Sequence, residues 1–139
     1  MGGALALCSL AACDDIIAGA PNYGYGDCFD PTKLTKPVLW TSGKLDAFTG
    51  FSDPATAEKL KQDLTTAGNK DFDVKVYPGV GHAFLNESPE PYKTAEAANE
   101  DFLSGDYGIT KPSFFPVNPT IQELAWGRII DFLAKWLKD

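Results

Sequence analysis

The chain of 139 residues contains one histidine, and its setting suits acid–base chemistry. His82 ends the loop Pro78–His82, which follows residues 73–77, a stretch that we predict to be a strand. Glycine lets a backbone turn sharply, and the loop contains two glycines, so it can present an imidazole at a strand end. A lone histidine is usually an ordinary structural residue. The glycine-bracketed loop after a strand favours a functional role for this one.

A carboxylate occupies the matching position one strand earlier. Asp46 follows the apolar stretch 37–41 in the loop Gly43-Lys44-Leu45-Asp46. Loops that leave the carboxyl ends of parallel strands meet at one sheet edge, so we expect Asp46 and His82 to lie in contact there. A carboxylate that accepts the Nδ1 proton of a histidine fixes the tautomer of the ring and stabilises its protonated form. The alternative is a solvated loop aspartate or a turn cap.

The elements that must position these residues follow from hydrophobic periodicity and capping signals. We predict helices over 3–13, 53–67 and 120–138, a short helix near 94–102, and strands over 16–20, 37–41 and 73–77. Asp53 is the expected N-cap of the second helix, and Thr120 and Glu123 have the spacing of a capping box before the last one. Strands that alternate with helices imply an α/β fold with a parallel sheet and right-handed crossovers.

Four segments together resemble one known family. They are Gly2-Gly3-Ala4-Leu5-Ala6, the stretch from Pro37-Val38-Leu39 to Asp46, the run Tyr77-Pro78-Gly79-Val80-Gly81-His82-Ala83-Phe84-Leu85-Asn86, and one closing segment made up of Tyr92, Ala95–Ala98 and Glu123–Arg128. The histidine motif is the most specific of them. The chain is similar to the C-terminal half of dienelactone hydrolases (carboxymethylenebutenolidase-like α/β-hydrolases).

The resemblance implies a fold and a reaction. The chain would be a partial α/β-hydrolase domain over 1–139, a parallel sheet flanked by helices that lacks the N-terminal strands and the nucleophile elbow. It would belong to a hydrolase of lactones or small carboxylic esters that uses no cofactor. Its triad would be Cys or Ser, His82 as general base and acid, and Asp46 as the group that orients His82. Phe84, Phe48, Phe51 and Tyr23 are candidates for the pocket lining.

The chain departs from the family pattern at two places. The family's nucleophile stands two residues before the first glycine of Gly2-Gly3, so it lies outside this chain, and Met1 holds the position of an oxyanion-hole amide. As a chain start, Met1 would offer an amine instead. About twenty extra residues, an insertion at about 99–119, separate Ala98 from Glu123.

Four other residues have side chains that could act as a substitute nucleophile. Cys8 and Cys13 are expected to be small core residues of the first helix, and Cys28 and Ser42 lie in loops without the strand–turn–helix elbow. The rival hypothesis is a catalytically inactive truncated fragment or interaction module. A third alternative is a lipoprotein, because Leu10-Ala11-Ala12-Cys13 resembles a lipoprotein cleavage box, although no Lys or Arg precedes the apolar stretch.

The composition argues against several classes of binding partner. The net charge is -7, and no Lys/Arg cluster offers a surface for nucleic acid. No apolar run approaches the roughly 20 residues of a membrane span. One histidine and three scattered cysteines give no metal-ligand spacing. The three cysteines form no disulfide framework, which favours a reducing compartment, the cytoplasm. The partner is then a small ester or lactone, and self-association is expected through an exposed sheet edge at Ile16–Ala18.

Overall fold

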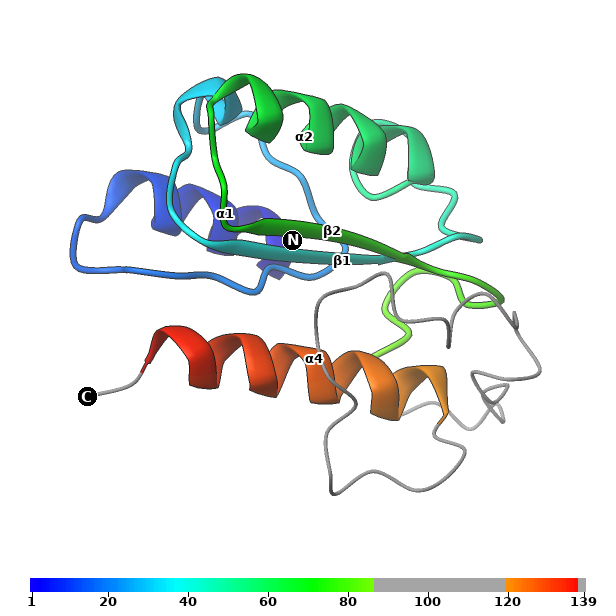
Figure 1. The fold of residues 1–139 in the computed structure, drawn as a ribbon. Helices are drawn as coiled ribbons and strands as arrows, with labels where there is room; N and C mark the ends of the chain where they lie inside the picture. The colour runs from blue at the N-terminus through cyan, green and yellow to red at the C-terminus, as the bar shows by residue number, and fades with distance from the viewer. Residues whose placement is uncertain (87–119, 138–139) are drawn as a thin grey trace.

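The computed structural model describes residues 1–86 and 120–137, and these form helices on both faces of a small parallel sheet (Figure 1). The elements in chain order are α1 (Gly2–Ala12), a short 3₁₀ helix η1 (Pro31–Lys33), β1 (Val38–Gly43), α2 (Pro54–Thr66), β2 (Phe72–Tyr77) and α4 (Ile121–Trp136). The helix predicted near 94–102 and the insertion at about 99–119 lie outside the described residues.

The sheet brings the ends of β1 and β2 to the same edge. The two strands pair in parallel from Val38 opposite Phe72 to Gly43 opposite Tyr77. Parallel neighbours need a crossover connection, and α2 provides it. The loops that contain Asp46 and His82 therefore begin side by side.

The strand predicted over 16–20 is displaced. Residues 19–23 do run parallel to β1, but only as two isolated bridges, Gly19 with Val38 and Asn22 with Thr41. Proline has no N–H to give to a ladder, and Pro21 stands in the middle of this segment, so the pairing is interrupted there. The prediction of a regular strand at 16–20 is wrong in its bounds and in its regularity.

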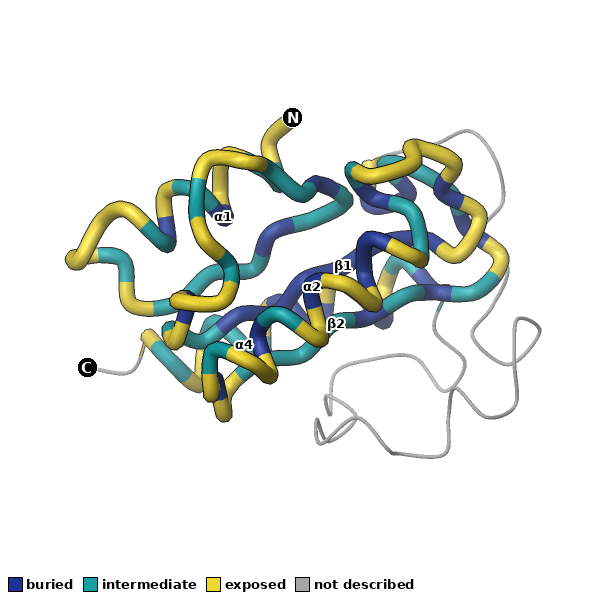
Figure 2. Tube along the Cα trace, turned by 90° about the horizontal axis from the view of Figure 1, so that it is seen from above, coloured by how far each residue is buried: buried dark blue, intermediate teal, exposed yellow. Residues whose placement is uncertain are grey.

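Each face of the sheet has its own hydrophobic cluster. All six residues of β1 are buried (Figure 2), and successive strand residues point to opposite faces. Val38 and Trp40 pack with α1 and α2, whereas Leu39 packs on the other face with α4. α2 and α4 accordingly lie on opposite sides of the sheet (Figure 1).

The helix starts follow the predicted caps, with one difference. The capping box of α4 is confirmed: the Glu123 amide donates to the Thr120 hydroxyl over 3.1 Å, and the Thr120 amide donates to the Glu123 carboxylate over 2.7 Å. Asp53 is the N-cap of α2, but its carboxylate accepts the Thr56 hydroxyl and the Gly50 amide instead of a first-turn amide. The Thr56 bond lowers the pKa of Asp53 against the opposing effect of burial.

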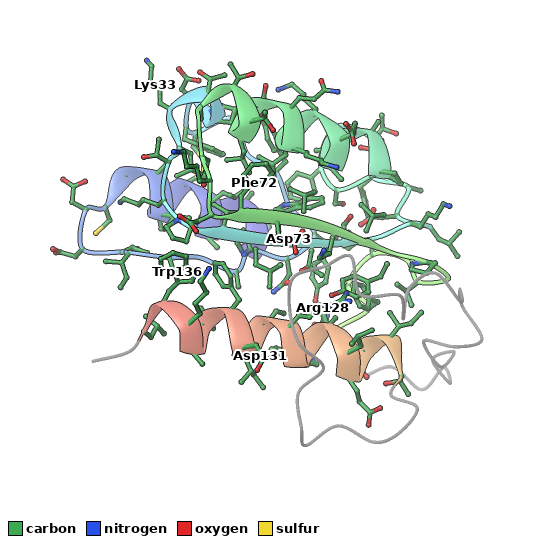
Figure 3. The ribbon with its side chains drawn as sticks, viewed as in Figure 1. Lys33, Phe72, Asp73, Arg128, Asp131 and Trp136 are labelled. Atoms are coloured by element: carbon green, nitrogen blue, oxygen red, sulfur yellow. A yellow bond between two sulfur atoms is a disulfide. The ribbon has the colours of Figure 1, made fainter. Side chains whose placement is uncertain are left out.

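A buried cation fixes α4 to the sheet. Arg128 projects from α4 toward β2 (Figure 3), donates to the Tyr77 hydroxyl over 3.2 Å, and lies 5.5 Å from the centre of that ring. Lys75 is also buried on this strand, 2.8 Å from the Asp73 carboxylate. Burial lowers the pKa of Lys75, and Asp73 partly offsets that effect.

The cysteines differ from expectation. Cys8 and Cys28 form a disulfide that joins α1 to the loop before η1, with Cα atoms 5.7 Å apart. The loop packs closely on α1, since a Cβ at Gly26 would meet Ala4 and both sulfurs at 3.2–3.3 Å. Cys13 is exposed, because α1 ends at Ala12. The prediction of unpaired cysteines with Cys8 and Cys13 in the core is therefore wrong.

No helix among the described residues is long and apolar enough to cross a bilayer.

Candidate active site

Backbone hydrogen bonds hold the two loops beyond the sheet together. The amide of Lys44 donates to the Tyr77 carbonyl over 2.7 Å, and that of Leu45 to the Val80 carbonyl over 2.9 Å. Gly43 makes this approach possible, because a Cβ there would lie 2.3 Å from the Val80 carbonyl oxygen. Any other residue at position 43 would push the loops apart.

Asp46 and His82 meet at this edge. The Nδ1 atom of His82 lies 2.8 Å from Oδ2 of Asp46, so the predicted contact is present. The Asp46 side chain has no exposed surface, and its second oxygen, Oδ1, accepts the amide of Phe48 over 3.1 Å. The His82 side chain keeps 29% of its surface exposed. A fixed, buried carboxylate thus faces one nitrogen of an imidazole that remains accessible.

A third residue, Ser52, contacts the imidazole, and the sequence analysis did not predict it. The hydroxyl of Ser52 lies 3.1 Å from Nδ1 of His82, and Ser52 is fully buried. The sequence holds only a weak signal for it, a hydroxyl residue in the loop of Asp46 immediately before the helix cap Asp53.

Aromatic rings surround His82. Phe48 lies edge-on at 4.5 Å between ring centres, and Tyr23 lies at 5.4 Å. Phe84 forms the next layer, 6.0 Å from Tyr23 and itself buried. Phe51 makes no ring contact with His82 among the described residues, and its carbonyl accepts the Tyr25 amide. Two of the four predicted lining residues therefore contact the imidazole directly.

The remaining candidates do not join this cluster. Within 1–86 and 120–137, both hydrogen bonds of the His82 ring go through Nδ1, and no hydroxyl or thiol bonds to Nε2. Cys8 and Cys28 are bonded to each other, and Ser42 is fully buried. Met1 is exposed at the N-cap of α1. The same residues contain no cluster of three His, Cys, Asp or Glu side chains that could hold a metal ion.

The family model described as the dienelactone hydrolase family matches residues 1–137. The chain belongs to the dienelactone hydrolase family. No curated protein matches it significantly.

This dienelactone hydrolase family member is similar in fold to a solved structure of another protein. A Klebsiella pneumoniae protein, provisionally described as a dienelactone hydrolase in its crystal structure, superimposes with a TM-score of 0.57 at 20% sequence identity. The match covers 96% of this chain and 48% of the Klebsiella chain. The chain therefore spans about half the length of that protein and has a partial α/β-hydrolase fold.

Proposed function

We propose that this chain provides the acid–base part of a hydrolase that opens lactones or cleaves small carboxylic esters. The observation that carries the proposal is the contact of buried Asp46 with Nδ1 of His82, in a ring whose Nε2 bonds to no described residue. Membership of the dienelactone hydrolase family supports the reaction class.

The proposed chemistry follows from the state of the imidazole. An ionised carboxylate only accepts hydrogen bonds, so Nδ1 carries the proton and Nε2 keeps its lone pair. Nε2 removes the proton of a Cys or Ser nucleophile as that atom attacks the ester carbonyl, and then gives it to the leaving alkoxide. Water, activated in the same way, releases the acid from the acyl-enzyme. Asp46 stabilises the imidazolium in both steps.

We place the nucleophile before α1, outside the residues of this chain, with the amide at position 1 as an oxyanion donor. The contacts of Gly3 support this placement. A Cβ at Gly3 would lie 1.9 Å from the Asn22 carbonyl oxygen and 2.9 Å from the Gly24 nitrogen, so α1 begins directly against the loop that contains Tyr23. Tyr23 in turn contacts the His82 ring. The start of α1 and the His82 ring therefore contact the same loop, on which this placement rests.

The test extends the chain upstream. The genomic or transcript sequence before Met1 is searched in frame for Gly-x-Cys or Gly-x-Ser, and the extended protein is assayed with p-nitrophenyl acetate and a dienelactone. We expect turnover that disappears in His82→Ala and in the Ala variant of the upstream Cys or Ser. Cys13→Ser, an exposed thiol, is the control and retains activity. An extended protein with no turnover of either substrate contradicts the proposal.

A second candidate is a non-catalytic module that associates through its sheet edge. On the β1 side of residues 19–23, the amides of Gly19 and Tyr23 donate to the Pro37 and Thr41 carbonyls, and the Gly19 and Pro21 carbonyls accept the amides of Leu39 and Thr41. Ile17, just before this segment, is 54% exposed. Leu5, on α1, is 58% exposed. An open edge beside apolar side chains favours pairing with another chain. We further propose a cytoplasmic location, a reducing compartment in which the Cys8–Cys28 bond of this structure would be open to reduction.

A further inference from the structure

Ser52 places a second oxygen on the ring nitrogen that Asp46 already holds. Its Oγ atom lies 3.1 Å from Nδ1 of His82, and the side chain is fully buried. We propose that Ser52 is a positioning residue, which fixes the plane of the His82 imidazole together with Asp46. Its consequence for catalysis rests on the proposed function, but its effect on the ring can be measured in this chain alone.

The protonation state decides what Ser52 does. Asp46 in its ionised form cannot donate, so the short contact with Nδ1 requires the Nδ1–H tautomer of His82. Ser52 Oγ then acts as a second acceptor of the same proton. A single acceptor lets the ring pivot about its hydrogen bond, whereas two oxygens at different positions hold the plane. Nε2, the atom that would exchange protons with substrate, is held by the same constraint.

Phe48 contacts Asp46, Ser52 and His82 alike. The amide of Phe48 donates to Oδ1 of Asp46, and the carbonyl of Phe48 accepts the amide of Ser52 over 3.0 Å. The Phe48 side chain packs edge-on against His82. The turn from 48 to 53 therefore sets the positions of both oxygens relative to each other, and Gly50, at φ +75°, lets this turn close.

The chain offers a matched control. Ser42 is also fully buried, and its hydroxyl has no hydrogen-bond partner among the described residues. Ser42→Ala removes a buried hydroxyl of the same size without touching the imidazole. Ser52→Ala removes one that contacts it.

The experiment observes His82 by ¹⁵N and ¹H NMR, which is unambiguous because it is the only histidine. The unaltered chain and Ser42→Ala are expected to show a protected Nδ1 proton. In Ser52→Ala, its exchange with water should be faster by roughly 2- to 10-fold, the effect of one ordinary hydrogen bond. Ser52→Thr restores the hydroxyl and should bring the rate back toward that of the unaltered chain.

Three results would overturn the proposal. They are an unprotected Nδ1 proton in the unaltered chain, equal exchange in the two Ala variants, and a rate in Ser52→Thr as high as in Ser52→Ala. In the upstream-extended protein, Ser52→Ala should lower kcat by roughly 2- to 10-fold with KM unchanged. If the NMR result holds and the extended protein is inactive, the proposed function fails and the positioning of His82 by Ser52 stands.

Discussion

Nδ1 of His82 lies 2.8 Å from Oδ2 of Asp46, although 36 positions separate the two residues in the sequence. The parallel register of β1 and β2 creates this contact, because it ends with Gly43 opposite Tyr77 and releases both loops at one edge. The Leu45 amide then bonds to the Val80 carbonyl, which keeps the loops together up to the two side chains.

Asp46→Asn in the upstream-extended protein should reduce kcat by about 10³- to 10⁴-fold. An amide can donate to Nδ1 and so favours the wrong tautomer, and the corresponding change in a serine protease has an effect of about 10⁴-fold. Ester turnover measures kcat, and the ring nitrogen shifts of His82 report the tautomer. Asp15→Asn, at an exposed position, is the control. A loss of less than tenfold would remove Asp46 from the triad.

The chain of 139 residues by itself should hydrolyse esters no faster than its His82→Ala variant. No described hydroxyl or thiol bonds to Nε2 of His82, and in acyl-transfer enzymes the nucleophile supplies many orders of magnitude of the rate. The measurement is turnover of p-nitrophenyl acetate and a dienelactone by both proteins. Activity that disappears with His82→Ala would instead point to Ser42 or a cysteine as nucleophile.

Reduction of the Cys8–Cys28 disulfide should lower the free energy of unfolding by about 3 kcal/mol. The bond closes a loop with a sequence separation of 20, and the chain-entropy model assigns that amount to such a loop. Urea unfolding with and without a reductant measures the difference. Cys8→Ser should remove the response to reductant, and Cys13→Ser, at the exposed free thiol, should keep it. Equal stability in both conditions would mean that the bond does not constrain the unfolded chain.

The isolated chain should self-associate at micromolar concentration, and Ile17→Lys should weaken the association. Ile17 is 54% exposed beside the segment that pairs with β1, and a lysine at a sheet edge deters pairing. Sedimentation velocity gives the distribution of species. Leu137→Lys changes an exposed apolar residue at the far end of α4 and should leave it unaltered. A chain that stays monomeric at these concentrations would show that this sheet edge does not pair with another chain in solution.

Asp53 should contribute stability that is lost only in acid. Hydrogen bonding to Thr56 lowers its pKa in the folded state below the ordinary value of 3.8. The contribution is therefore complete above the unfolded pKa and disappears as pH falls through the lower folded pKa. Asp53→Asn should be less stable than the unaltered chain at pH 6, and the gap should close as the pH falls below 3.8 and through the lower folded-state pKa. The midpoints of urea unfolding across this pH range measure the difference in stability. A difference that is independent of pH would mean that the geometry of the side chain, and not its charge, stabilises the fold.

Local patterns in the sequence determined the parts of this protein that depend on near neighbours. The capping box at Thr120 and Glu123 is a relation over three residues, and it forms as predicted. The alternation of strand and helix predicts a parallel sheet, and its geometry alone is enough to bring the loops of Asp46 and His82 to one edge. Both residues could therefore be found without the structure, although their catalytic role remains a prediction.

The tertiary structure decided what depends on close approach between distant segments. The residues near Ser52 in sequence give only a weak signal for its contact with His82, because the 29 residues between the two must first fold into α2 and β2. Cys8 and Cys28 meet only because the loop before η1 returns over α1. The regular strand predicted at 16–20 fails for a related reason: hydrophobicity indicates burial, but a parallel ladder also needs an amide at each pairing position, and Pro21 has none. Periodicity thus places side chains on faces, and only the packed chain sets which polar atoms on those faces come within bonding distance.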